Sequence, residues 1–451
     1  MSKPSKKINI ITLGCAKNQV DSEALWSQFE GNDLEVTSNI SDASIAVINT
    51  CGFIEEAKKQ SIDTILETVR LKNEGKLERV IVMGCLSERY HDELSKEIPE
   101  VDRFFGSKEI PAIVSELGGN YKYDLLGERV LSTPNYSAYL KISEGCDNPC
   151  SFCAIPLMRG LHRSKPVEQI MDEVMRLTAK GVKELVVIGQ DTTYYGLDLY
   201  GGRKLASLLQ SLASVKELEW IRLMYAYPAK FPLDILAPIR DSENICPYLD
   251  LPIQHASDDV LKSMRRGTTR RAIESLIASI RKEVPDIALR TTLITGYPSE
   301  TERDFNELLD FIRTVRFDRL GVFTYSQEDG TTSFDLGDPI PQVEKEARRA
   351  KIMDLQKEIS RERNEERIGK VARAVVERCE NGTYIGRTQW DAPEVDNEIF
   401  ITPMPGRRLA VGEFVDVKVT DAAEFDLYGE VVQEPRASEA KPSSAIAPWT
   451  K

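Results

Sequence analysis

The feature that most constrains this chain is a group of three cysteines in one short loop. Cys146, Cys150 and Cys153 lie within the stretch EGCDNPCSFCAIPLMRG at 144–160. A closed zinc site uses four ligands, usually two Cys-x2-Cys pairs, and no second such pair occurs. A [4Fe-4S] cluster normally takes four thiolates, so three would leave one iron open to another ligand. The pattern favours such a cluster, with a zinc knuckle or chance clustering as the alternatives.

A second set of three cysteines is spread along the first 85 residues. Cys15, Cys51 and Cys85 each end an apolar, β-type run: INIITLGC (8–15), IAVINTC (45–51) and RVIVMGC (79–85). Segments with helical apolar spacing separate these runs, which predicts a parallel sheet covered by helices. Ligands bind beyond the carboxyl ends of parallel strands, so we expect all three thiols at one edge. The alternative is three independent buried cysteines.

The rest of the chain predicts two further domains. After an N-terminal α/β domain at 6–133, the region 134–369 alternates strands and helices in about six βα units, short of the eight of a closed TIM barrel. It ends in a long charged helix at 343–369. The predicted strands are 137–143, 184–190, 220–226, 248–255, 287–296 and 319–326; the predicted helices between them are 166–181, 203–215, 270–283 and 299–315.

The C-terminal region changes to short alternating apolar runs. Residues 370–435 therefore predict a small antiparallel β-barrel of OB-like size. Residues 371–432 contain twelve acidic and six basic side chains, a net charge of −6. The tail at 436–451 is rich in Ser, Ala and Pro, and we expect it to be disordered.

Composition indicates a soluble cytoplasmic protein. Of 451 residues, 41% are hydrophobic and 29% charged, and no signal peptide or 18-residue apolar run occurs. Thiols stay reduced in the cytosol, so cysteines there indicate metal binding or catalysis rather than disulfides. Cys246 and Cys379 lack a motif, and we expect both to be buried thiols. The net charge of −13 is unfavourable for general polyanion binding.

The 146/150/153 spacing, with Phe152 before the last cysteine, resembles the radical S-adenosylmethionine enzymes. The resemblance implies that S-adenosylmethionine chelates the open iron through its amino and carboxylate groups and yields a 5′-deoxyadenosyl radical. Together, the two cysteine sets, the α/β domain and the C-terminal barrel resemble the methylthiotransferases over residues 8–435. That family implies two [4Fe-4S] clusters and two S-adenosylmethionine molecules, with Cys15, Cys51 and Cys85 on the auxiliary cluster.

The motifs TLGCAKNQVDSE (12–23), NTCGFIEEAKKQSID (49–63) and DAPEVDNEIFI (391–401) resemble the branch that modifies an aspartate of the small-subunit ribosomal protein numbered twelve. An acidic barrel suits such a basic partner and argues against tRNA, whose phosphates favour basic surfaces. A merely solubilising surface would also be acidic. The alternatives are a tRNA adenosine methylthiotransferase and a non-catalytic metal-binding ribosome adaptor. We further expect a flavodoxin- or ferredoxin-type electron donor and a monomer.

The resemblance also implies that strand ends of the second domain hold S-adenosylmethionine. The candidates are Gln190, Arg290, Thr292 and Gly296, which lie at or beyond the carboxyl ends of predicted strands. We assign no catalytic side chain. Weaker candidates near these strand ends or the cysteine loop are Tyr139, Lys141, Arg159, Arg163, Gly189, Asp191, Gln254 and His255.

Overall fold

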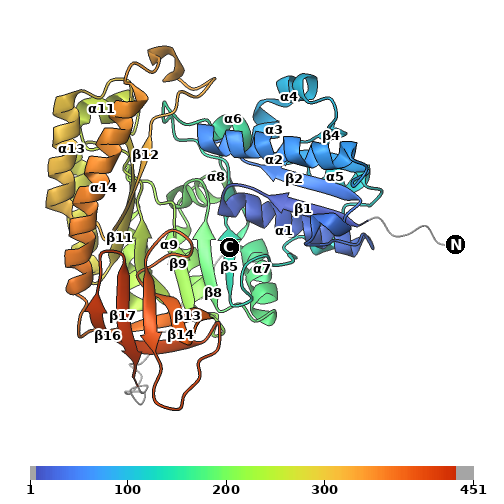
Figure 1. Ribbon diagram of the computed structural model, residues 1–451. Helices are drawn as coiled ribbons and strands as arrows, with labels where there is room; N and C mark the ends of the chain where they lie inside the picture. Colours follow the sequence, from blue (N-terminus) through green and yellow to red (C-terminus); the bar gives the residue numbers. More distant parts are fainter. Residues whose placement is uncertain (1–6, 433–451) are drawn as a thin grey trace. The chain divides into compact units, whose positions relative to one another are not determined.

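A computed structural model describes residues 7–432, and the chain divides into two compact units, Met1–Ser360 and Arg361–Lys451. Figure 1 follows the chain through both units. The domain boundaries predicted at 133 and 369 stay predictions, and the predicted tail at 436–451 lies outside the described residues. Within residues 7–432, no helix has the length and apolarity needed to cross a membrane.

The first unit begins with a four-stranded parallel sheet in the order β1-β2-β3-β4. Its strands are β1 (Ile8–Thr12), β2 (Ile45–Thr50), β3 (Arg79–Gly84) and β4 (Arg103–Phe104). The first three confirm the predicted strands. The two-residue β4 was not predicted, because it has no apolar run of its own.

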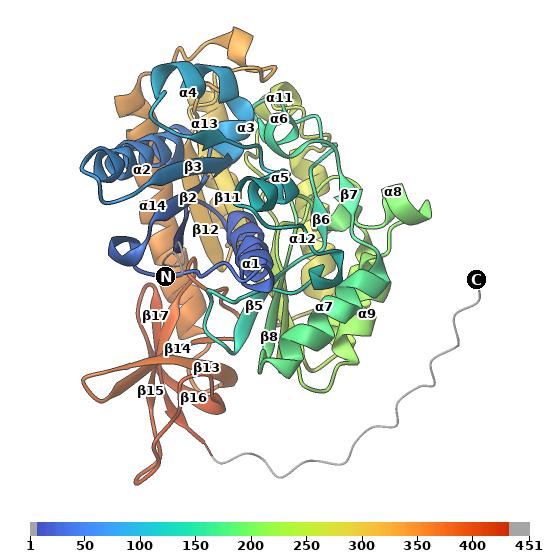
Figure 2. The same ribbon diagram turned by 90° about the vertical axis from the view of Figure 1, so that its right-hand side faces the viewer.

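Helices cover both faces of this sheet, as Figure 2 shows. Leu25 and Phe29 of α1 (Ala16–Gly31) pack on one face with Ile113 of α5 (Ile110–Glu116). The other face is covered by α2 (Glu55–Asn73), α3 (Cys85–Arg89) and α4 (His91–Glu97). Burial on both faces explains why β2 is apolar almost throughout rather than alternating.

The second sheet of this unit has six parallel strands in the order β12-β11-β10-β9-β8-β5. Strands that lie next to one another in this sheet also follow one another along the chain, which is the arrangement of an open, partial βα barrel. All six predicted strands are present: β5 (Ser137–Lys141), β8 (Glu184–Ile188), β9 (Trp220–Leu223), β10 (Ile245–Asp250), β11 (Ala288–Thr295) and β12 (Arg319–Thr324).

Amphipathic helices bury their apolar stripes against this sheet in one continuous core. They are α7 (Val167–Ala179), α9 (Leu205–Ala213), α10 (Leu236–Asp241), α12 (Arg270–Glu283) and α13 (Glu302–Val315), with the short α8 (Leu197–Tyr200) and α11 (Asp258–Ser263) in the connections. The helix α14 (Gln342–Glu365) ends four residues before the predicted end at 369. Residues 366–369 form a turn instead.

The second unit contains a closed five-stranded barrel in the order β13-β14-β15-β17-β16. Its strands are β13 (Val371–Glu380), β14 (Thr383–Thr388), β15 (Glu398–Thr402), β16 (Phe414–Ala422) and β17 (Asp426–Val431). Four neighbouring pairs are antiparallel, as predicted, and β15 with β17 is parallel. A closed ring with an odd number of strands cannot alternate direction throughout, so closure itself requires a parallel pair.

Candidate active site

The first cysteine set lies at one edge of the N-terminal sheet. Cys15 follows β1 and precedes α1, Cys51 directly follows β2, and Cys85 directly follows β3 as the first residue of α3. The strands are parallel and in register, with Thr12 opposite Asn49 and Thr50 opposite Gly84. The expected placement at the carboxyl edge of the sheet is therefore present.

Two glycines allow the three loops to approach closely. A Cβ on Gly14 would lie 2.6 Å from the Cβ of Cys51, and φ at Gly14 is +89°, in the left-handed region. A Cβ on Gly52 would lie 2.8 Å from the Cα of Leu86, next to Cys85. Any larger residue would separate the loops, so glycine is needed at both positions.

The thiols of this set differ in exposure. Cys15 is exposed, whereas Cys51 and Cys85 are buried. Burial raises the pKa of Cys85 to about 12, although the nearby Arg159 guanidinium opposes this shift. Because metals bind the thiolate, loading a metal here must release the proton that burial retains.

The second cysteine set occupies the loop after β5. A two-stranded ribbon of β6 (Ser143–Glu144) and β7 (Arg163–Ser164) closes the base of the loop, and α6 (Ile155–Arg159) follows the last cysteine. Within the loop, the Cys153 amide donates to the Cys150 carbonyl at 3.2 Å, and the Cys146 amide donates to the Gly160 carbonyl at 3.1 Å. These bonds turn the loop back on itself and bring the Cys150 thiol near those of Cys146 and Cys153.

Polar side chains surround the second set. Arg266 Nη1 donates to the Cys150 sulfur at 3.2 Å, and Asn148 Nδ2 lies 3.4 Å from the Cys146 sulfur. Burial raises the pKa of Cys146 to about 11 and that of Cys153 to about 12, and the neighbouring thiols reinforce both shifts. As in the first set, metal binding must displace protons.

Both sets fit an iron–sulfur cluster in their donor chemistry. Each consists of three thiols, the soft ligands that such clusters use. Between residues 7 and 432, no three His, Cys, Asp or Glu side chains are placed to hold a single metal ion. Three polar atoms just beyond the carboxyl ends of β5, β8 and β10 are buried and have no hydrogen-bond partner among the described residues; these are Ser143 Oγ, Gln190 Oε1 and Gln254 Oε1. A bound polar cofactor could satisfy them.

Three of the four residues predicted to hold S-adenosylmethionine lie in the carboxyl half of a barrel strand or just beyond it: Gln190, Thr292 and Gly296. Arg290 is the third of the eight residues of β11 and lies in its amino half. Gln190 follows β8 and donates from Nε2 to Glu144 Oε1 at 2.6 Å. Arg290 and Thr292 share one face of β11, where Arg290 pairs with Asp250 at 3.0 Å. Gly296 follows β11 and packs against Lys345, since a Cβ there would lie 2.3 Å from the Lys345 Cγ.

The weaker candidates divide into buried supports and surface residues. His255 is fully buried, accepts from the Ser257 amide at 3.0 Å and lies 3.4 Å from Glu300, which indicates a structural role. Arg163 is exposed, whereas Arg159 is buried. The expectation of a buried thiol holds for Cys246 and is wrong for Cys379, which lies exposed on β13.

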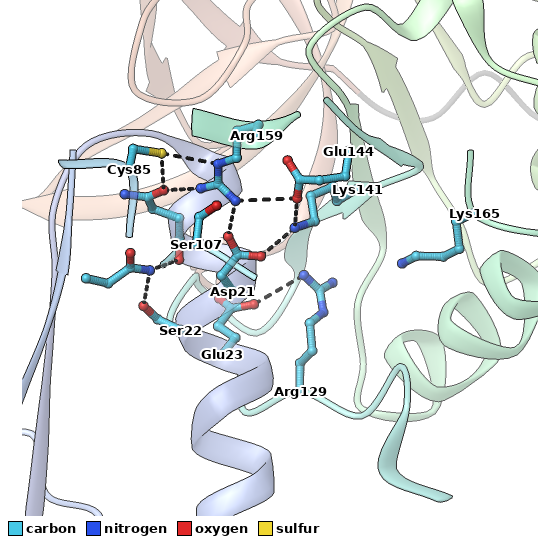
Figure 3. Close-up of polar contacts among 12 residues, drawn as sticks. Asp21, Ser22, Glu23, Cys85, Ser107, Arg129, Lys141, Glu144, Arg159 and Lys165 are labelled. Carbon is cyan, nitrogen blue, oxygen red and sulfur yellow. Dashed lines mark hydrogen bonds and ion pairs between the residues drawn. The ribbon is translucent and has the colours of Figure 1, made fainter. Parts of the chain in front are cut away.

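Arg159 is the centre of a buried charge network that reaches a thiol of the first cysteine set (Figure 3). Its Nε donates to the Cys85 sulfur at 3.2 Å, and its Nη1 pairs with Asp21 at 2.6 Å and with Glu144 at 3.4 Å. Lys141 pairs with Asp21 and, at 2.7 Å, with Glu144. The network therefore runs from a thiol of the first set to the residue two positions before Cys146.

The charges in this network stabilise one another. Burial alone would lower the pKa of Lys141, but Asp21 and Glu144 outweigh it and raise the pKa to about 12. Burial would raise the pKa of Glu144, and Lys141 and Arg159 instead lower it to about 2. Asp21 and Glu144 carry no sequence signal for this role, because only the fold brings Asp21, from the first half of α1, to the Lys141 and Arg159 that also pair with Glu144.

Three family models match successive parts of the chain. They are described as Uncharacterized protein family UPF0004 at residues 7–106, the Radical SAM superfamily at 140–312 and the TRAM domain at 368–432. Membership of the Radical SAM superfamily implies a [4Fe-4S] cluster and S-adenosylmethionine. Among solved structures, the chain is similar to the radical S-adenosylmethionine methyltransferase TsrM from Kitasatospora setae, with a TM-score of 0.53 and 13% identity over 71% of this chain and 75% of that one. This likeness supports the fold.

Curated relatives match the chain over nearly its full length. The protein named ribosomal protein uS12 methylthiotransferase RimO from Cytophaga hutchinsonii is 52% identical over 95% of this chain and 98% of its own length. Proteins with the same name from Christiangramia forsetii and Chloroherpeton thalassium are 51% and 52% identical over 96% of this chain, covering 97% and 100% of their own lengths. The chain belongs to the RimO family of radical S-adenosylmethionine methylthiotransferases.

Proposed function

We propose that this enzyme replaces a β-hydrogen of an aspartate in ribosomal protein uS12 with a methylthio group. It would use two [4Fe-4S] clusters and two molecules of S-adenosylmethionine. The observation that carries the proposal is the pair of three-thiol sets in one compact unit, connected through Arg159. The names of relatives about half identical to this chain supply the substrate.

In this proposal, Cys146, Cys150 and Cys153 hold the radical-generating cluster, and Cys15, Cys51 and Cys85 hold the auxiliary one. When bound, cluster and S-adenosylmethionine supply a carbon-centred radical that can take hydrogen from an unactivated carbon. Gln190, Arg290, Thr292 and Gly296 would line the cofactor's site at the strand ends. The buried charges around Arg159 would keep the two ligand sets in a constant arrangement, which proximity catalysis requires.

The C-terminal barrel supports a basic protein as the partner. Phe400 and Tyr428 stack with their ring centroids 5.2 Å apart and line a groove of about 510 Å³. Glu380 and Glu430 line the same groove. Aromatic faces and carboxylates both attract lysine and arginine side chains. A surface of this kind suits a ribosomal protein better than the phosphates of tRNA.

The remaining expectations complete the proposal. The enzyme would act in the cytoplasm as a monomer and receive electrons from a reduced flavodoxin- or ferredoxin-type protein. The 134–369 segment would form the radical-generating domain, residues 6–133 the auxiliary-cluster domain and 370–435 the substrate-binding barrel.

Two measurements test the proposal. Anaerobically reconstituted protein should contain about eight irons per chain, four for each cluster; one zinc without iron would instead support a non-catalytic adaptor. Mass spectrometry should find that uS12 from a strain lacking the gene has lost the mass of one methylthio group, which the restored gene returns. Unchanged uS12 together with tRNA lacking a methylthio group would overturn the proposal in favour of the tRNA alternative.

A further inference from the structure

A buried lysine lies beside the first cysteine set. Lys17 is in the first turn of α1, two residues after Cys15, and is only 8% exposed. Its Nζ lies 3.1 Å from the centroid of the Tyr225 ring, which follows β9 of the other sheet. The ammonium group is therefore at the place where the carboxyl edges of the two sheets meet.

Lys17 has no anionic partner within the described part of the chain, where its ammonium makes no hydrogen bond and no ion pair. Nearby cations differ in this respect. Lys141 and Arg159 each pair with Asp21 and Glu144, and Arg290 pairs with Asp250. The Lys17 side chain is largely covered, so its ammonium is only partly hydrated, and the face of one aromatic ring compensates for only part of the lost hydration. An arriving anion would remove this deficit.

The aromatic ring under Lys17 is held firmly at the edge of the barrel sheet. Tyr225 has φ of +60°, a left-handed conformation that non-glycine residues rarely adopt and that is concentrated at functional sites. Its amide donates to Asp250 Oδ2 at 3.0 Å, and its carbonyl accepts from the Thr192 amide at 3.0 Å. Asp250 is also the partner of Arg290, one of the residues predicted to hold the cofactor.

The same edge leads to the second cysteine set. Thr192 follows Asp191, which accepts from Asn148 Nδ2 at 2.8 Å, and Asn148 in turn reaches the Cys146 sulfur at 3.4 Å. Lys17 is thus two residues from Cys15 of the first set. Through Tyr225 it is also connected to the hydrogen bonds that hold Asn148 beside Cys146 of the second set. A substrate group held there would lie between the two proposed clusters.

We propose that the Lys17 ammonium binds the side-chain carboxylate of the aspartate that is modified. The inference rests on the proposed function. In aspartate, the β-carbon is bonded directly to this carboxylate, so a cation that holds the carboxylate fixes the reacting carbon one bond away. The cofactor's own carboxylate is the rival anion. In the proposed chemistry, however, that group is already bound to the open iron.

The test measures binding of uS12 to the reconstituted enzyme, in two forms of uS12 that differ only by Asp→Asn at the modified position. Lys17→Met should weaken binding of the Asp form by about 30-fold or more, because a buried charge pair loses one partner. It should leave binding of the Asn form unchanged. Lys17→Arg keeps the charge and should retain most of the preference for Asp. Lys59→Met, the same substitution at an exposed lysine of α2, is the matched control and should change neither affinity.

Other readouts separate the possible outcomes. Lys17→Met should keep the wild-type iron content, affinity for S-adenosylmethionine and rate of its cleavage without uS12. A Lys17→Met variant with wild-type preference for Asp overturns the inference, as does one that loses only S-adenosylmethionine binding. If the Lys17→Met variant does not load its clusters, the affinities of the wild-type enzyme for the Asp and Asn forms of uS12 are compared instead. Equal affinity for the two forms overturns the inference. A wild-type enzyme that does not modify uS12 at all would instead overturn the proposed function.

Discussion

Each of the two cysteine sets contributes three thiols, but the sets are assembled in different ways. Cys146, Cys150 and Cys153 come from one loop, whose turn is closed by bonds within residues 143–164. Cys15, Cys51 and Cys85 come from three strand ends and meet only because β1, β2 and β3 are parallel and in register. A local motif therefore carries its own geometry, whereas the dispersed set depends on the packing of a whole sheet.

Removing either set should have the largest effect, and the two removals should differ. Replacing Cys15, Cys51 and Cys85 by Ala should abolish methylthiolation and leave about four irons per chain, while cleavage of S-adenosylmethionine persists. Replacing Cys146, Cys150 and Cys153 by Ala should abolish both reactions. Iron analysis and quantification of 5′-deoxyadenosine check this. Loss of cofactor cleavage in both variants would contradict the division of labour between the sets.

Truncating the arginines that contact each set should have the next largest effect. Arg159→Met removes one of the two cations that pair with Asp21 and Glu144 and leaves Lys141 as their remaining partner, so the free energy of unfolding should fall by about 1.5–3 kcal/mol. It also removes a hydrogen bond to the Cys85 sulfur, which should lower the reduction potential of the first cluster only. Arg266→Met removes the bond to Cys150 and should lower the potential of the second cluster only.

Denaturant unfolding and redox titration followed by electron paramagnetic resonance measure these effects. Arg163→Met is the control, because this arginine is exposed and has no side-chain partner among the described residues. It should change stability by less than about 0.5 kcal/mol and neither potential. A shift of both potentials in either variant would show that the two sets do not respond separately.

Adding a methyl group where two loops approach most closely should have a smaller effect on stability and iron content. The loss of iron should be restricted to the first cysteine set, Cys15, Cys51 and Cys85. Gly14→Ala places a Cβ against Cys51 and also strains a left-handed residue. Gly75→Ala, with φ of +74° and no atom within 4 Å of its added Cβ, has only the backbone strain, about 1 kcal/mol. Gly14→Ala should be more destabilising by about 1–3 kcal/mol, and its iron should fall toward four per chain. Equal iron content in the Gly14→Ala and Gly75→Ala variants would contradict the close approach of the loops as the cause of the iron loss.

The smallest perturbation leaves the chain unchanged and compares thiol labelling before and after reconstitution. In the metal-free enzyme, iodoacetamide should label the exposed Cys15 faster than the buried Cys51 and Cys85. Reconstitution should protect Cys15, because a thiolate bonded to iron is unavailable to the reagent. Cys379 is exposed and belongs to neither set, so its labelling, followed by peptide mass spectrometry, should not change. Persistent labelling of Cys15 at wild-type activity would remove it from the proposed ligands.

Much of the fold could be predicted because its signals are local. The six barrel strands and the first three strands of the N-terminal sheet are long apolar runs, and each is present. The short β4 and the parallel β15–β17 pair could not be predicted, since one has no apolar run and the other follows from closing five strands into a ring. The exposure of Cys379 likewise depends on which face of β13 points outward.

The candidate site divides in the same way. The sequence by itself determined which residues could serve as thiol ligands, the order of the strands that carry them and the net acidity of the barrel, because composition and spacing are properties of the chain alone. Only the tertiary structure decided that Arg159 reaches Cys85, that Asp21 and Glu144 share two cations, and that Lys17 lies over Tyr225 without an anion. Charge pairing and hydrogen bonding act over a few ångströms in space, and only folding brings to that distance residues that lie far apart in the sequence, such as Arg159 with Cys85, 74 positions away, and with Asp21, 138 positions away.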